Sequence, residues 1–101
     1  MPTPATFSFE SDIIVWRGPS PFFFAAVPAQ DVAAIRHAAR IASYGWGVVP
    51  VEAEIGGTAF GTSLFPREGG YLLPIKAAVR SKLDLGVGDT VRVRMTIRMP
   101  R

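Results

Sequence analysis

The chain has 101 residues, of which 49% are hydrophobic, carries a formal charge of +3 at neutral pH and contains no cysteine. This length and apolar content exclude a disordered chain and predict one domain over residues 1–101, with a flexible tail over residues 1–5. No apolar run approaches the ~20 residues of a membrane-spanning helix, no secretory signal pattern is visible, and the lack of cysteine excludes disulfides and thiolate metal sites, so we expect a cytoplasmic protein.

The charge is distributed unevenly along the chain. Residues 1–66 hold three arginines and five acidic residues, whereas residues 67–101 hold eight basic and three acidic residues. A basic C-terminal third can favour nucleic acid or another polyanion. Charge asymmetry bears on association and not on fold, and we favour the interpretation that these residues form a solvated barrel wall.

The first third of the chain predicts two strands and a helix. Phe7 and Phe9 alternate with polar residues, and the strand continues to Trp16 after an irregularity at residues 11–12. After a Gly/Pro turn, the run from Phe22 to Val27 is apolar throughout, which is typical of a central strand. A helix follows over residues 29–43, with its apolar residues on one face: Val32, Ile35, Ala39 and Ala42.

The middle of the chain predicts a β-hairpin. Apolar residues alternate with Pro50, Glu52 and Glu54 over residues 49–55, which indicates a strand whose start is an edge or a bulge. Gly56 and Gly57 form a two-residue hairpin loop, and the returning strand covers residues 58–65. A polar turn is expected over residues 66–70.

The stretch over residues 71–97 predicts a strand, a short helix and a final strand. Pro74 suits the start of the helix, which runs to Leu83 and places Ile75, Val79 and Leu83 on one face. Gly86 or Gly88 is expected to take a positive φ where the helix ends.

From Thr90 the apolar period is two, and this fixes which residues face the interior. A slip of one residue would bury three arginines, which is why we expect Arg92, Arg94, Glu52 and Glu54 to face solvent. The expected interior residues are Val91, Val93, Met95 and Ile97, together with Val51, Ala53 and Ile55.

The chain contains a weak internal repeat. Residues 24–28 and 71–74 each form an apolar strand that ends in proline and is followed by a helix, a glycine and a strand. Two such halves predict a mainly β fold: a closed, pseudo-two-fold β-barrel of about six to seven strands, with a helix capping each end and no exposed sheet edges.

Two resemblances follow from these segments. The pattern of residues 73–91, apolar-Pro-x-x-x-x-Val-Arg-x-x-Leu-x-Leu-x-x-Gly-Asp-x-Val, resembles the swapped-hairpin half-barrel of the AbrB/MazE group. The whole chain resembles the domain of unknown function "nineteen-oh-five" family. The matching segments are FAAVP (24–28), GWG (45–47), IGGT (55–58), TSLFP (62–66), YLLPIK (71–76), VR (79–80) and GDTV (88–91). That resemblance implies a double-split β-barrel, related in fold to AbrB-like DNA binders, and no established activity.

One group of residues suggests a ligand site at the barrel mouth. Aromatic and basic residues stand at predicted element ends, and such a cluster can bind a small anionic or planar ligand. Ordinary half-buried packing is the alternative, and for these side chains we favour it. The candidate ligand-binding residues are Trp16, Arg17, Tyr44 and Trp46, with Lys76 and Arg80 one helical turn apart.

A second group, Arg92, Arg94 and Arg98, lies on one face of the last strand. Phosphate contact is the functional interpretation of this stripe. The structural interpretation is that these arginines pair with Glu52 and Glu54 across strands. We favour it because a neutralised stripe has little positive potential to attract DNA.

The sequence gives little support for a catalytic site. His37 is the single histidine, no phosphate-binding glycine loop is present, and Ser63 lacks the context of a nucleophile. We predict no catalytic residue, no metal site and no cofactor, and keep an enzyme that uses Glu52, Glu54 or Asp89 as the least supported hypothesis.

The leading functional hypothesis is a cytoplasmic binding module for a small ligand or a protein partner. It would act as a monomer or a weak homodimer, without a membrane. An AbrB-like nucleic-acid binder is the alternative.

Overall fold

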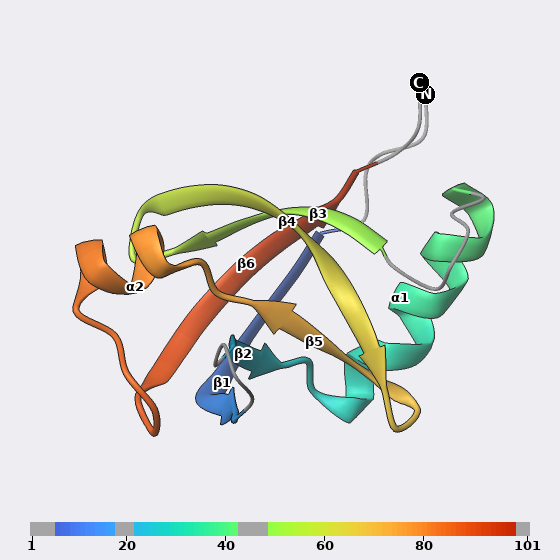
Figure 1. Ribbon diagram of the computed structural model, residues 1–101. Coiled ribbons are helices and arrows are strands. Elements are labelled where there is room, and N and C mark those ends of the chain that lie inside the picture. The colour runs from blue at the N-terminus through green and yellow to red at the C-terminus, as the bar shows by residue number, and fades with distance from the viewer. Residues whose placement is uncertain (1–5, 18–21, 43–48, 99–101) are drawn as a thin grey trace.

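The computed structural model describes residues 6–17, 22–42 and 49–98, and Figure 1 shows their arrangement as a barrel with two helices. The tail predicted over residues 1–5 therefore lies outside the described residues. In chain order the elements are β1 (Thr6–Trp16), β2 (Phe22–Ala26), α1 (Ala29–Ala42), β3 (Val49–Ile55), β4 (Thr58–Arg67), β5 (Gly70–Pro74), α2 (Ala77–Leu83) and β6 (Thr90–Ile97).

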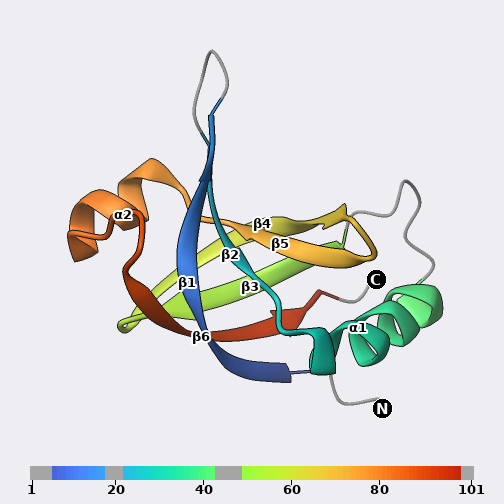
Figure 2. The same ribbon diagram turned by 90° about the horizontal axis from the view of Figure 1, so that it is seen from below.

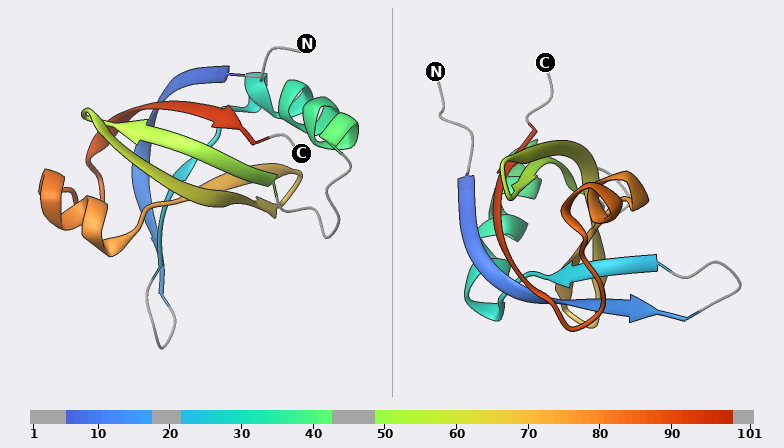
Figure 3. Two further views of the ribbon diagram at one scale, coloured as in Figure 1. Left: turned by 90° about the horizontal axis from the view of Figure 1, so that it is seen from above. Right: turned by 90° about the vertical axis from the view of Figure 1, so that its left-hand side faces the viewer.

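Six antiparallel strands close into a barrel in the order β1-β2-β5-β4-β3-β6 (Figure 3). The two longest strands, β1 and β4, each belong to two sheets. One half of β1 pairs with β6 and the other with β2, and β4 likewise pairs with β3 and then with β5. Because two strands are shared in this way, the predicted double-split barrel is confirmed, with six strands.

The irregularity predicted at residues 11–12 is the point where β1 changes partner. Asp12 is the last residue paired with β6, and Ile13 is the first paired with β2. The in-out alternation of β1 continues without a break across this point. The backbone of Ile13 also bonds to the loop before β6. Its amide donates to the Asp89 carbonyl at 2.8 Å, and its carbonyl accepts from the Gly88 amide at 2.9 Å. The strand therefore bends between two sheets without a bulge.

The strand order carries the two-fold symmetry that the internal repeat predicts. One half of the chain is β1-β2-α1-β3 and the other is β4-β5-α2-β6. Exchanging β1 with β4, β2 with β5 and β3 with β6 returns the same circular order. Each half supplies one shared strand, and neither half alone can close the barrel.

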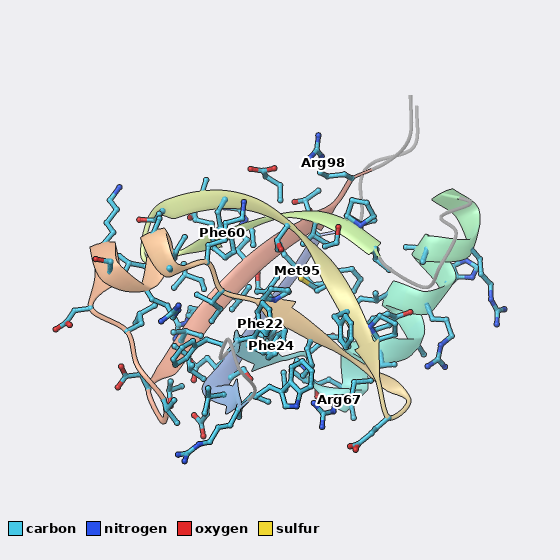
Figure 4. All side chains as sticks on the ribbon, viewed as in Figure 1. Phe22, Phe24, Phe60, Arg67, Met95 and Arg98 are labelled. Atoms are coloured by element: carbon cyan, nitrogen blue, oxygen red, sulfur yellow. The ribbon has the colours of Figure 1, made fainter. Side chains whose placement is uncertain are left out.

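The core lies inside the barrel, and the predicted faces of β3 and β6 are confirmed. Met95 is fully buried near the centre of the barrel (Figure 4), and Val93 pairs with Phe9 on one side and with Ile55 on the other. The other predicted interior residues, Val51, Ala53, Val91 and Ile97, are also buried. The predicted outward residues are all exposed: Arg92, Arg94, Glu52 and Glu54.

The two helices lie at opposite ends of the barrel, as predicted (Figure 1). Helix α1 inserts the fully buried Ile35 into the core, with Val32 and Ala39 packed around it. At the other end, Val79 of α2 is buried and Leu83 packs partly against the core. Each helix therefore closes one mouth of the barrel with a single apolar face.

The predicted end of α2 at Leu83 is confirmed, whereas its predicted start at Pro74 is wrong. Pro74 is the last residue of β5, where it pairs with Phe24, and the helix begins at Ala77 after Lys76 at its N-cap. The Ile75 amide still donates to the Phe23 carbonyl at 2.9 Å, so the strand ladder extends past the proline that cannot donate. At the other end, Asp84 takes the left-handed conformation at φ 54°, a place the sequence assigned to glycine. Gly88 has a positive φ of 89°, inside the following loop.

The loops that join β3 to β4 and β4 to β5 each have two residues with positive φ. The predicted Gly56-Gly57 loop is confirmed, with φ of 55° and 79°. The turn predicted over residues 66–70 is shorter than expected, since β4 continues to Arg67 and only Glu68 and Gly69 form the loop, with φ of 50° and 80°. This extension of β4 places the Arg67 side chain on the wall of the barrel.

Candidate functional site

The outer surface of the barrel has two chemically different faces. The outward residues of β6, β3 and the first half of β1 are charged or polar. Where β1 and β4 join β2 and β5, the outward residues are mainly apolar, with Arg67 at the end of β4. We call this second surface the aromatic face and define it by Ile14, Trp16, Phe22, Phe24, Phe65, Leu72 and Pro74.

The aromatic face arises from strand periodicity, because large apolar residues occupy outward positions in these parts of the strands. In β1 the side chain of Ile13 is buried, whereas Ile14 and Trp16 are 43% and 53% exposed. Phe22 on β2 and Phe65 on β4 are 52% and 48% exposed. These residues are brought together by pairing, since Trp16 lies opposite Phe22 and Ile14 lies opposite Phe24. Large exposed apolar side chains that gather in this way are typical of interaction sites.

Four aromatic rings form a continuous row over this face. The ring centroids of Trp16 and Phe22 are 6.1 Å apart, those of Phe22 and Phe24 are 6.4 Å apart, and those of Phe24 and Phe65 are 6.4 Å apart. Phe24 and Phe65 come from strands on either side of β5, so their rings meet over its outward residues. The interplanar angles of 22°, 35° and 29° keep the rings close to parallel, which is a favourable arrangement for aromatic pairs.

The row of rings borders two hollows on the outside of the barrel. One has a volume of about 530 Å³ and the other of about 390 Å³. Figure 2 shows β1 and β2 projecting together from the barrel. Both hollows are lined by Trp16, Phe24, Arg67 and Leu72. The larger hollow is completed by Phe22, Ser63, Leu64, Phe65 and Pro74, and the smaller by Ile14, Val15, Ala26 and Glu68.

Of the residues predicted as a ligand site, Trp16 lines both hollows. Arg17, the next residue, is exposed and lines neither hollow. Tyr44 and Trp46 lie outside the described residues.

The two predicted basic residues near α2 lie elsewhere. Lys76 is exposed at the helix N-cap. The guanidinium of Arg80 lies 3.7 Å from the centroid of the Phe23 ring, and its Nε donates to the Ile75 carbonyl at 3.3 Å. Arg80 therefore makes contacts within the protein that hold α2 against the barrel.

Apart from Trp16, the residues of the aromatic face were not predicted as a site, and neither was Arg67. The run over residues 22–27 was interpreted as a strand covered on both sides, because it contains no polar residue. In the barrel, one side of that strand faces outward, with Phe22 half exposed. For β4, the available signal was that Leu64 and Phe65 are adjacent. Adjacent side chains of a strand point to opposite faces, so one of these two apolar residues is expected to face outward.

The arginine stripe on β6 is flanked by carboxylates on both sides. Arg92 donates to Glu10 of β1 at 2.8 Å, so the prediction that Arg92 pairs with the glutamates of β3 is corrected. Arg94 lies opposite Glu54 in the register. Arg98 lies near Glu52, since atoms of both side chains lie within 4.0 Å of where a Cβ on Gly61 would be. The hydrogen bond from Arg92 to Glu10 and the charge of that carboxylate raise the pKa of Arg92, so this guanidinium stays charged across the accessible pH range.

The carboxylates considered for catalysis lie away from the hollows. Glu52 and Glu54 are exposed on the charged face, and Asp89 accepts a hydrogen bond from the Gly86 amide at 2.8 Å within its own loop. None of the three lines either hollow. Within the described residues, no group of three or more potential metal-binding side chains lies together, and no helix is long and apolar enough to cross a membrane.

The fold and surface define a class: a double-split antiparallel barrel with one charged and one aromatic outer face. The chain belongs to the family described as "Domain of unknown function (DUF1905)", whose model matches residues 9–95 and so spans all six strands and both helices. A search of curated proteins found no match to the chain.

Proposed function

We propose that this protein is a binding module that holds a small, largely apolar molecule on its aromatic face. One observation supports this most strongly: a row of four rings borders a hollow of about 530 Å³. Pockets that take small molecules typically have volumes of roughly 300–1,000 Å³ and mainly apolar walls. The exposed apolar surface would leave water on binding, and this is the driving force for such a complex.

The position of the hollows outside the barrel also supports an external site. The interior is occupied by large side chains that are fully buried, including Leu64, Leu73 and Met95. A barrel of this size fills its interior with side chains, whereas wider barrels can hold a ligand inside. Binding on the aromatic face would therefore leave the core unchanged.

The nucleic-acid alternative has weaker support. The stripe of Arg92, Arg94 and Arg98 lies between Glu10 and Asp12 on β1 and Glu52 and Glu54 on β3. Three positive charges against four negative ones give no excess positive field for phosphates. A protein partner remains the competing occupant of the aromatic face, and the cytoplasmic location expected from the sequence stays a prediction.

The proposal is tested with a neutral fluorescent probe, N-phenyl-1-naphthylamine, titrated into the full chain. We expect saturable binding with an increase and a blue shift of probe emission. Phe65→Ser removes one wall of the larger hollow and should weaken binding several-fold. Val87→Ser is the matched control, because Val87 is 58% exposed and lies in the loop before β6, away from the aromatic face. Absence of saturable binding, or equal weakening by both substitutions, would refute the proposal.

A further inference from the structure

The charge of the ligand is indicated by one residue, Arg67. It is the last residue of β4 and lines both hollows. Of the described side chains that border them, it is the one that carries a positive charge. Figure 4 shows Arg67 on the same side of the barrel as Phe22 and Phe24, with Arg98 at the opposite side.

The surroundings of Arg67 leave its guanidinium available. Its partner across the strand pair is Gly70, which has no side chain to oppose it. No carboxylate of the described residues lies within ion-pair distance of it, whereas Arg92 is paired with Glu10. Glu68 borders the smaller hollow only. The larger hollow therefore has a cation in its wall and no carboxylate among its described lining residues.

The two polar side chains that line the larger hollow, Ser63 and Arg67, both come from β4. Ser63, Phe65 and Arg67 are alternate residues of β4 and point outward together. Ser63 and Arg67 are four residues apart, about 13 Å along a strand, with the Phe65 ring between them. The remaining lining side chains are apolar. A molecule that fills this hollow therefore meets a cation, a hydroxyl and apolar walls.

From this arrangement we infer that the ligand is a flat apolar molecule with one negatively charged group, a carboxylate or a sulfonate, bound by Arg67. The inference rests on the proposed function, because it names the ligand class of the same site. A guanidinium presents a planar fork of donors that matches a carboxylate, and such charge-assisted bonds are stronger than neutral ones. The rings of Trp16 and Phe24 beside Arg67 lower the local polarity, which strengthens the attraction.

The size of the site favours a small molecule over a macromolecule. The strands that form the middle of the aromatic face, β2 and β5, have five residues each. A stable protein interface buries roughly 800 Å² on each partner, about 20–30 residues. The larger hollow matches instead the volume of a compact organic acid.

The test compares two probes that differ by one charged group. 8-Anilinonaphthalene-1-sulfonate carries a sulfonate, and N-phenyl-1-naphthylamine is its neutral counterpart. At low salt we expect the full chain to bind the sulfonate about tenfold more tightly than the neutral probe. Arg67→Gln should remove most of this preference, so that the two probes bind the variant with similar affinity. Arg94→Gln, which removes the same charge from the opposite face, should change neither affinity. Raising the salt concentration should weaken the sulfonate alone.

Each other outcome has a distinct meaning. If neither probe binds, the proposed function fails, and the inference fails with it. If both probes bind with equal affinity, or if Arg67→Gln and Arg94→Gln act alike, the proposed function stands and the anionic ligand is refuted. If sedimentation at rising protein concentration shows a dimer that excludes both probes, the aromatic face is occupied by a second copy and the inference is overturned. Circular dichroism of each variant confirms that it is folded.

Discussion

At the scale of the residue, neighbouring strands decide what an arginine does. Arg92 faces Glu10 and forms an exposed ion pair with it. Arg80 lies over the Phe23 ring and bonds to a backbone carbonyl. Arg67 faces a glycine and borders two hollows. The same side chain thus serves as surface charge, helix anchor or candidate ligand contact, according to what the fold places beside it.

The face of each β6 residue gives the first prediction, which compares Val93→Asp with Arg92→Asp. Val93 is fully buried between Phe9 and Ile55, so an aspartate there would have no partner. Burying an unpaired charge costs several kcal/mol, a large part of the ~5–15 kcal/mol that stabilises a small domain, and we expect Val93→Asp not to fold. Arg92→Asp places two carboxylates side by side in water and should lower the urea midpoint only slightly.

Urea unfolding followed by circular dichroism measures both variants. Glu10→Gln is the control for the ion pair, and its midpoint should lie close to that of the natural chain, since the Arg92 and Glu10 side chains are 82% and 58% exposed. Equal losses for Val93→Asp and Arg92→Asp would contradict the assignment of the two faces.

At the scale of the element, the shared strands β1 and β4 create the two surfaces of the barrel. Each runs through both sheets, so its outward residues can contribute to two surfaces. In β1 the outward residues pass from Glu10 and Asp12 on the charged face to Ile14 and Trp16 on the aromatic face. The change occurs where the strand changes partner, and one strand therefore serves two surfaces.

The start of α2 gives the second prediction. Lys76 occupies the N-cap with the extended backbone that this position requires, and its side chain makes no capping bond. Lys76→Ser supplies an oxygen for a free amide of the first turn and removes a positive charge from the positive end of the helix. We expect a gain of about 1 kcal/mol in the free energy of unfolding, within the usual range of ~0.5–2 kcal/mol for such caps.

Thermal and urea unfolding measure this gain. The matched control is Lys82→Ser in the last turn of the same helix, where the lysine is favourably placed relative to the helix dipole and its loss should be neutral or slightly destabilising. A stabilising effect from both substitutions, or from neither, would show that capping is not the cause.

At the scale of the whole molecule, the six strands form one closed ring whose wall presents two outer faces of different chemistry. The charged face balances its arginines with carboxylates from the two strands beside β6. The aromatic face leaves large rings in contact with water. Hydration of exposed rings is less favourable than hydration of charged side chains. The aromatic face therefore gains more free energy than the charged face when it is covered.

The balance of positive and negative charges on the charged face gives the third prediction. The natural chain should not bind duplex DNA even at about 50 mM salt, because four carboxylates surround the arginine stripe. A variant in which Glu10, Asp12, Glu52 and Glu54 are replaced by their amides should gain measurable affinity. Its binding should fall with salt on a log–log plot, with a slope of about −0.9 for each phosphate contacted. Fluorescence anisotropy with a labelled duplex measures both, and tight binding by the natural chain would restore the nucleic-acid hypothesis.

Much of the fold could be predicted from local patterns. The period of two in residues 91–97 assigned every face of β6, because a residue's side of a strand depends only on its place in the alternation. The Gly56-Gly57 loop was recognised from its residue types, since both positions need a positive φ. The first turn of α2 was misplaced because proline is compatible both with a strand end and with a helix start, and only its pairing with Phe24 distinguishes them.

The candidate site was much less predictable. Trp16 was recognised as an aromatic residue at a strand end, but its neighbours in the row come from two other strands. The run over residues 22–27 predicts burial, and whether the outer side of β2 is covered depends on whether a helix packs there. Both helices lie instead at the mouths of the barrel, which leaves that side open (Figure 1).

The sequence by itself therefore determined the order of the elements, the inward and outward faces of β3 and β6, and the two-fold repeat, because these follow from steric preferences and burial periods within short segments. Only the tertiary structure decided which strands are neighbours. Arg92 meets Glu10 across 82 residues of chain, and Phe24 and Phe65 meet over β5, since closure of the barrel sets the order and register of strands far apart in sequence. The ion pair and the aromatic face both depend on that order.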